Sequence, residues 1–187
     1  MVRIHPVGAV LVAVGAVCAL GAFVATALAS PGRDPATQGR PVVALVQLER
    51  GVLADINAYR EQHHLHALRL SPHLTAAARQ HSEEMALDGY FGHDSVSGAA
   101  FWRRVQHYYS STSRRNWAVG ENLLWESPGV SAGHALQLWI GSPEHKKILL
   151  TANWREIGIS AVHVAHAPGI YHGLGVTIVT ADFGVRR

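Results

Sequence analysis

The most constraining feature of this sequence is a change of hydrophobic pattern near Trp154. Before it, apolar residues recur at three- and four-residue spacing, which is typical of helices packed on one side. After it, the segment 156–163 and part of 173–183 alternate between apolar and polar residues, which is typical of strands. Residues 165–169 have the composition of a hairpin turn. Helices first and strands last, without regular alternation, predict an α+β fold with helices packed on an antiparallel sheet.

Capping signals place the helix boundaries. Ser71-Pro72 combines a capping serine with proline at the first helical position, and Gly89 is suited to end that helix. Ser142-Pro143 starts a short helix, which puts His145 near a positively polarised N-terminus. The other expected elements are a helix with the stripe Leu45, Leu48, Val52, Ile56 and Tyr59, a short helix over 101–105, a strand over 119–125 and a helix after Ser131.

The N-terminal region has the features of an export segment. Residues 7–29 carry no charge and end in Ala27-Leu28-Ala29, which fits a small-x-small cleavage pattern. The block exceeds the roughly 7–15 apolar residues of a typical signal peptide, and about 20 such residues can span a bilayer. We therefore expect residues 1–29 to be a signal peptide or membrane anchor, 30–41 a Pro/Gly-rich linker and 42–187 the folded domain. The domain is then secreted or otherwise extracytoplasmic, with membrane contact only through 7–29 if that block is uncleaved.

Charge and cysteine content exclude two classes of protein. The only cysteine, Cys18, lies in the uncharged block, so the exported part cannot form an internal disulfide. The formal net charge is only +3, and the basic residues form no stripe, which argues against a nucleic-acid partner.

Three phrases carry the candidate chemistry: Gly89-Tyr-Phe-Gly-His93-Asp-Ser, Gly120-Glu121-Asn122, and a segment from Trp139 through His145 to Leu149. Two imidazoles and a carboxylate are the usual ingredients of a transition-metal or acid–base site. We take His93, Glu121 and His145 as the candidate site residues.

These phrases, in this order, resemble the bacterial, cysteine-free branch of the CAP superfamily (SCP domain), which includes cysteine-rich secretory proteins, antigen 5 and pathogenesis-related proteins. The other matching positions are Asn57, Arg60, Leu74, Ala77-Ala78, His81, Met85, Ser142-Pro143, Ile148, Gly158 and Asp182-Phe183-Gly184. The resemblance implies an α-β-α sandwich, a central antiparallel sheet flanked by helices, with an open cleft lined by two histidines and two acids. His93, Glu121 and His145 match three of the four. The position of the second acid holds Ser142, and no motif assigns the role to nearby Glu144 or Glu126.

The chemistry of this set stays open. His93, His145 and Glu121 could hold zinc or another divalent cation, or they could hydrogen-bond one another and brace the cleft. Ser95 invites a nucleophile hypothesis, but the sequence has no Gly-x-Ser-x-Gly elbow around it. His81 lies on the apolar side of its helix and is expected to be a core histidine, while His63, His64 and His66 are expected at the surface.

Two functions follow from these expectations. One is a module at the cell envelope or outside the cell that binds an unknown lipid, glycan or protein. The other is a metal-assisted hydrolase of peptide or cell-wall substrates. The lack of a matched second acid favours binding, because Glu121 alone would then have to serve as general base.

Overall fold

The computed structural model describes residues 10–12, 42–110 and 117–186. Its helices are α1 (Val46–Gln62), α2 (Pro72–Asp88), α3 (Phe101–Tyr108), α4 (Ala132–Gly141) and α5 (Pro143–Leu149). Its strands are β1 (Val10–Val12), β2 (Val43–Ala44), β3 (Arg69–Leu70), β4 (Trp117–Glu126), β5 (Glu156–Val164) and β6 (Val176–Arg186). A 3₁₀ turn, η2 (Gly169–Tyr171), lies in the β5–β6 connection.

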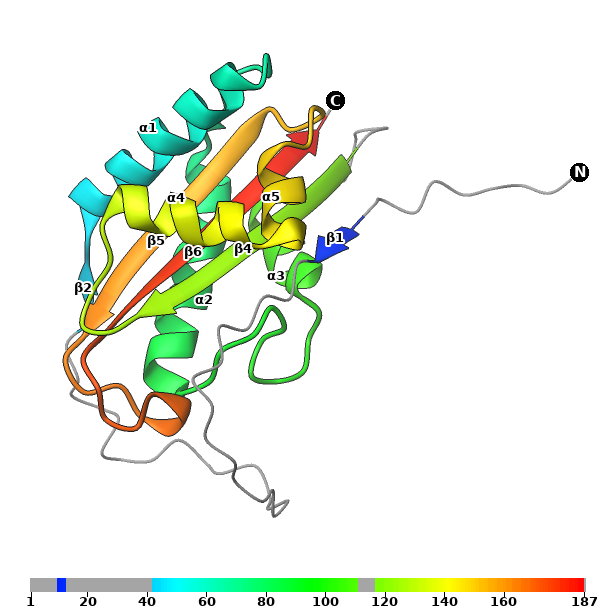
Figure 1. Ribbon diagram of the computed structural model, residues 1–187. Coiled ribbons are helices and arrows are strands. Elements are labelled where there is room, and N and C mark those ends of the chain that lie inside the picture. The colour runs from blue at the N-terminus through cyan, green and yellow to red at the C-terminus, as the bar shows by residue number, and fades with distance from the viewer. Residues whose placement is uncertain (1–9, 13–41, 111–116, 187) are drawn as a thin grey trace, which may run out of the picture.

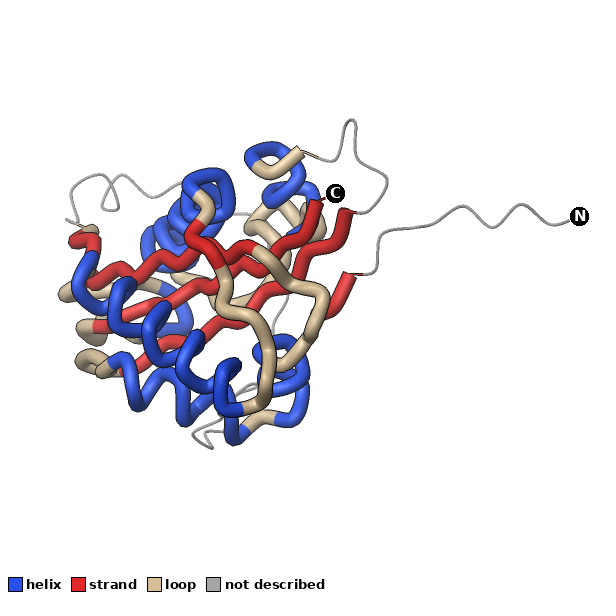
Figure 2. The backbone as a smooth tube through the Cα atoms, turned by 90° about the horizontal axis from the view of Figure 1, so that it is seen from above, coloured by secondary structure: helices blue, strands red, loops and turns tan. Residues whose placement is uncertain are grey.

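The strands form one sheet in the order β1-β4-β6-β5-β2, with β3 also paired to β5. The central strand β6 is antiparallel to both of its long neighbours, β4 and β5. The short β1 pairs parallel with β4, and the short β3 pairs parallel with β5. In Figure 1, α1, α4 and α5 cover the near face of the sheet and α2 and α3 the far face. Figure 2 shows the same layers from above. The expected α-β-α sandwich is confirmed.

The capping signals act as expected. Ser71 Oγ accepts a bond from the Leu74 N–H at the start of α2, and Ser142 Oγ does the same for His145 N–H at the start of α5, both at 3.5 Å. Gly89 ends α2 with φ of 72°, a left-handed conformation that favours glycine. A Cβ at Gly89 would also lie 2.7 Å from the Pro168 carbonyl carbon, so glycine lets the end of α2 touch the β5–β6 connection.

The alternating segments 156–163 and 173–183 lie largely in strands β5 and β6, as predicted. Nearly every residue of β5 and β6 is buried, because helices cover both faces of the sheet. The helix layer is tight: a Cβ at Gly158 would lie 2.0 Å from the Leu74 carbonyl carbon, so α2 rests directly on β5. The expected strand over 119–125 extends to the ten residues of β4.

Most of the predicted signal or anchor segment and all of the predicted linker lie outside the described residues. Val10–Val12 form β1, with Val12 opposite Glu121, while the rest of 1–29 and the linker 30–41 are not described. Among the described residues, no helix has the length and apolarity needed to cross a membrane. Residues 111–116, between α3 and β4, also lie outside the described residues.

Candidate functional site

His93 and Glu121 are in direct contact. His93 lies in the loop after α2, and Glu121 lies in β4 with a fully buried side chain. The distance from His93 Nδ1 to Glu121 Oε1 is 2.8 Å. Because a carboxylate oxygen accepts, Nδ1 is the donor, and Nε2 is the acceptor nitrogen of the neutral ring. The carboxylate therefore sets both the orientation and the tautomer of His93.

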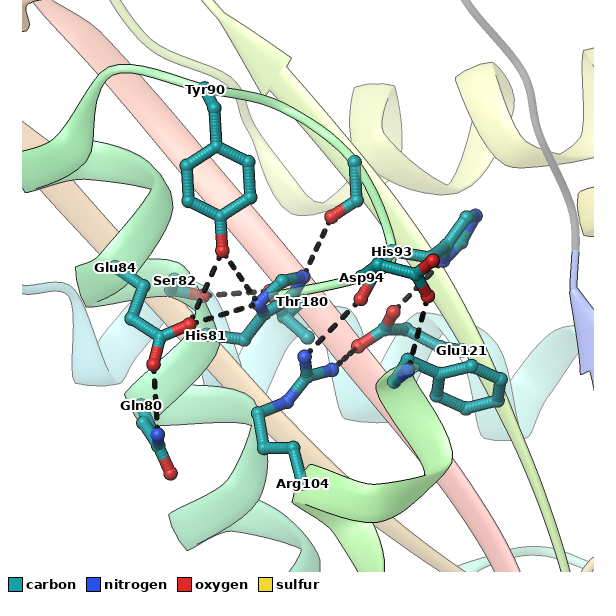
Figure 3. Close-up of polar contacts among 12 residues, drawn as sticks. Gln80, His81, Ser82, Glu84, Tyr90, His93, Asp94, Arg104, Glu121 and Thr180 are labelled. Atoms are coloured by element: carbon teal, nitrogen blue, oxygen red, sulfur yellow. Dashed lines mark hydrogen bonds and ion pairs between the residues drawn. The ribbon is translucent and has the colours of Figure 1, made fainter. Parts of the chain in front are cut away.

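The Glu121 carboxylate is also paired with a cation, the guanidinium of Arg104 in α3 (Figure 3). Its Nη2 forms an ion pair with Glu121 Oε2, and its Nη1 donates to the His93 carbonyl oxygen at 3.3 Å. Only 2% of the Arg104 side chain is exposed. The start of α3 is tied to the same loop, since the Phe101 N–H donates to Asp94 Oδ1 at 3.2 Å. Arg104 thus holds both the histidine loop and the carboxylate.

Sequence reasoning missed Arg104. The available signal was its spacing, because Phe101, Arg104 and Val105 fall on one side of a helix, and all three are buried. An arginine on an apolar helix face indicates a buried partner.

Charge compensation keeps Glu121 ionised. Burial by itself raises the pKa of Glu121, but the Arg104 guanidinium and the hydrogen bond from His93 bring the pKa below its usual range. A fully buried carboxylate is stable here because it is paired and hydrogen-bonded.

A second buried acid lies beside it. Asp182 of β6 is directly opposite Glu121 in the antiparallel register, and it is fully buried. Neither of its carboxyl oxygens has a hydrogen-bond partner of normal geometry among the described residues. Burial, and then the nearby Glu121 carboxylate, raise the pKa of Asp182 well above its usual range. Sequence reasoning included Asp182 in the family pattern but not in the site, because the burial of β6 on both faces is visible only in the structure.

His145 approaches from the other side of β4. It lies in α5 with 5% exposure, and burial followed by the nearness of His93 lowers its pKa to about 4. Asn122 Nδ2 donates to the His145 carbonyl oxygen at 3.2 Å. Glu121 and its neighbour Asn122 point to opposite faces of the sheet, so the Gly-Glu-Asn phrase holds the two histidine segments from both sides. His145 is therefore near His93.

The other sequence candidates lie elsewhere. Ser142 caps α5, and its hydroxyl donates to the exposed Glu144 at 3.2 Å. Glu126 is the last residue of β4. Ser95 lies in a turn closed by a 2.8 Å hydrogen bond from the Gly98 N–H to the Ser95 carbonyl oxygen. None of the three supplies an acid or nucleophile to the His93–Glu121 pair in the described contacts.

His81 is a core histidine, as predicted. It is fully buried, and its Nε2 donates to the Gly92 carbonyl oxygen at 2.8 Å (Figure 3). Tyr90 and Glu84 flank its other nitrogen at 3.5 and 3.8 Å. His81 therefore braces the loop that carries His93. His63, His64 and His66 are exposed, as predicted.

The placement of these donors does not fit a divalent ion. Within the described ranges there is no group of three or more His, Cys, Asp or Glu side chains arranged to hold a metal. Both oxygens of Glu121 are engaged, one by His93 and one by Arg104, whose guanidinium already supplies the compensating charge. The zinc site stays a prediction from the sequence.

A depression of about 500 Å³ lies away from these residues, along the C-terminal half of α1. It is lined by Ala54, Asn57, Ala58, Glu61, Leu65, His66 and Ala67. The cleft expected at His93 and His145 stays a prediction.

Comparisons with known proteins agree with this architecture. An outer surface protein from Borrelia burgdorferi superposes with a TM-score of 0.62 over 80% of this chain and 100% of that chain, at 17% identity. An extracellular protein containing an SCP domain from Bacillus anthracis gives a TM-score of 0.55 and 26% identity, covering 76% of this chain and 42% of that chain.

A curated relative, the uncharacterized membrane protein YlbC of Bacillus subtilis, is 26% identical over 111 residues. The match covers 59% of this chain and 30% of YlbC, so the chain corresponds to less than a third of that relative. The model of the CAP family, described as the cysteine-rich secretory protein family, matches residues 53–183, a span that includes His93, Arg104, Glu121, His145 and Asp182. With its helix–sheet–helix layers and the paired His93 and Glu121, this chain belongs to the CAP family.

Proposed function

We propose that this chain is an extracytoplasmic binding module whose ligand is recognised by the imidazoles of His93 and His145. The observation that carries the proposal is the pairing of Glu121. Its carboxylate is fully buried and bonded to Arg104 and His93, so its role is to hold His93 in one orientation.

The same pairing argues against a hydrolase. A general base must reach a substrate proton directly or through one water. Glu121 has both oxygens engaged and no exposed surface, and Asp182 is equally buried.

The protonation states favour a hydroxyl-bearing ligand, and we propose a glycan. His145 is neutral at physiological pH because its pKa is about 4. A neutral imidazole offers one donor and one acceptor, and His93 uses Nδ1 as donor toward Glu121. The neutral imidazole of His145 suits sugar hydroxyls better than phosphate, which arginine clusters recognise.

The proposed location outside the cytoplasm rests on two observations. Residues 7–29 form an uncharged block with a small-x-small end. Two similar proteins of known structure are described as an outer surface protein and an extracellular protein.

NMR of the ¹⁵N-labelled full chain tests the binding function. Solubilised cell-wall glycan fragments are titrated while the His93 and His145 ring signals are followed. We expect both sets of signals to move, and His93→Ala to weaken binding by roughly tenfold, the value of one good hydrogen bond. His107→Ala, on the exposed side of α3, is the matched control and should bind normally.

Two outcomes would contradict the proposal. One is ring signals that respond to phosphatidylglycerol vesicles but not to glycan fragments, which would identify a lipid headgroup instead. The other is turnover of a fluorogenic peptide or glycan substrate by the wild type that Glu121→Gln abolishes, which would identify a hydrolase.

A further inference from the structure

A polar strip crosses the sheet face covered by α2. Ser82 of α2 donates to Thr180 Oγ1 of β6 at 2.8 Å, and both side chains are buried. Asp182 is two residues further along β6 on the same face, because side chains alternate along a strand. Its neighbours Ala181 and Phe183 belong to the apolar core on the opposite face. The strip therefore runs from Ser82 through Thr180 to Asp182 and Glu121.

Asp182 and Glu121 form a cross-strand pair. They are directly opposite in the β4–β6 register, which places their Cβ atoms about 4.5–5.5 Å apart on the same face. Both side chains have no exposed surface, so water cannot screen one carboxyl from the other. Like charges directly opposite each other in a sheet are destabilising.

Among the described residues, Arg104 is the cation that lowers the pKa of both acids. The charged or titratable groups around the pair are Arg104 from α3, His81 from α2 and His93 from the loop. On the β5 side, the residue opposite Asp182 is Gly158, which brings no charge. Arg104 is already committed to Glu121 and to the His93 carbonyl oxygen. A second ionised carboxylate would be buried without compensation, which is strongly unfavourable.

A protonated Asp182 removes this conflict. A carboxylic acid has one O–H donor, and that donor needs an acceptor when it is buried. Glu121 is the carboxylate that lies opposite, and no other hydrogen-bond partner for Asp182 is found among the described residues.

We propose that Asp182 is the second acid of this site and that it acts as a positioning residue, holding a proton that it donates to the Glu121 carboxylate. This inference rests on the proposed function, in which His93 binds the ligand. Because Asp182 donates a hydrogen bond to the Glu121 carboxylate, that carboxylate stabilises a second ring proton on His93 less strongly. A smaller fraction of His93 then carries both ring protons, which favours the ring form that has an acceptor nitrogen.

The proton on Asp182 is directly observable. In the full chain labelled with ¹³C at aspartate side chains, we expect one carboxyl signal to remain at the protonated position above about pH 5, where ordinary aspartates have already titrated. Asp182→Asn should remove this signal, while Asp55→Asn, on α1, should leave it. In Glu121→Gln the signal should begin to titrate in this range, because the neighbouring negative charge is gone. If every aspartate signal has titrated by about pH 5, the proposal is wrong.

The positioning role has its own readout. Ring ¹⁵N shifts report the fraction of His93 that carries both ring protons at about pH 6, near the reference pKa of histidine. We expect this fraction to rise in Asp182→Ala, which removes the donor to Glu121, and to equal the wild type in Asp182→Asn, whose amide is neutral and can still donate. An equal rise in both variants, or no rise in either, would overturn the positioning role.

These measurements need no ligand. Failure to find glycan binding would leave the Asp182 result intact, and failure of the ¹³C test would leave binding by His93 and His145 intact. If Asp182→Ala does not fold, the wild-type carboxyl signal and its loss in Asp182→Asn still decide whether Asp182 holds a proton.

Discussion

The two faces of the sheet bury different kinds of arginine. On the face covered by α1, α4 and α5, Arg60 is fully buried, and its bonds within the described part of the chain go to backbone carbonyl oxygens, at 2.6 Å to Leu149, 3.0 Å to His66 and 3.1 Å to Thr151. On the face covered by α2 and α3, Arg104 is paired with the Glu121 carboxylate. Arg60 joins the end of α1 to the segment after α5, whereas Arg104 sets the charge of the site.

The apolar clusters around the two arginines also differ in size. Arg60 borders a continuous apolar cluster built from Val52, Ile56, Trp139, Leu149 and Phe183, among other residues. The opposite face has two smaller apolar clusters, one around Met85 and Ile178 and one around Leu74 and Phe101. A buried ion pair is seldom the most stabilising choice, since apolar replacements are often equally stable. We infer that the face covered by α1, α4 and α5 contributes more to the stability of the fold. The face covered by α2 and α3 contributes less, because it holds the polar residues around His93.

The largest expected effect is at Arg104. Arg104→Met leaves the Glu121 carboxylate buried without its cation, and we expect a loss of about 3–5 kcal/mol in the free energy of unfolding, measured with urea. The double variant Arg104→Met/Glu121→Gln should recover most of this loss, because neither charge then remains. A loss below about 1 kcal/mol for the single variant would show that the pair is solvated, as surface pairs are.

Truncation of apolar side chains tests whether the faces differ in their cores. Leu74 on the α2 face and Leu149 on the opposite face are both fully buried. We expect Leu74→Ala and Leu149→Ala each to cost about 2–5 kcal/mol, measured by the same urea titration. A loss near 0.5 kcal/mol at either position, typical of a surface site, would mean that its face packs loosely.

Arg60 should matter for stability alone. Arg60→Met removes charge-assisted bonds to three carbonyl oxygens, and we expect a loss of about 1.5–3 kcal/mol in the free energy of unfolding. The ring ¹⁵N signals of His93 should be unchanged, in contrast to Arg104→Met, which should move them. If both arginine variants move the His93 signals equally, the two faces of the sheet do not have separate roles in stability and in the site.

The smallest expected effect is the pH dependence from His145. Its pKa is about 4 in the folded chain, against about 6.5 for an ordinary histidine, so below pH 6.5 the unfolded chain binds a proton that the folded chain does not. The free energy of unfolding therefore falls as the pH falls from about 6.5 towards 4. Between about pH 7 and 6 we expect a contribution below about 1 kcal/mol, absent in His145→Gln. A wild-type minus variant difference that does not change with pH would show that His145 is not held neutral.

Helix boundaries were predictable because their signals are local. Ser71-Pro72, Gly89 and Ser142-Pro143 act within one turn of the backbone they cap. The burial of β5 and β6 on both faces was not predictable from alternation, because it depends on helices from distant parts of the sequence. The contact between His93 and Glu121 followed from the family pattern rather than from spacing, since the two are 28 positions apart.

The sequence by itself determined the class of fold and the residue types at the site, because periodicity, caps and the His93, Glu121 and His145 phrases are properties of short segments. Only the tertiary structure decided what those residues do. It placed Arg104 against Glu121 and set Asp182 opposite it, through the docking of α3 and the register of β6 on β4. The charge of a buried carboxyl depends on groups within a few ångströms, whatever their separation along the chain. That distance is created only when the helices close over the sheet.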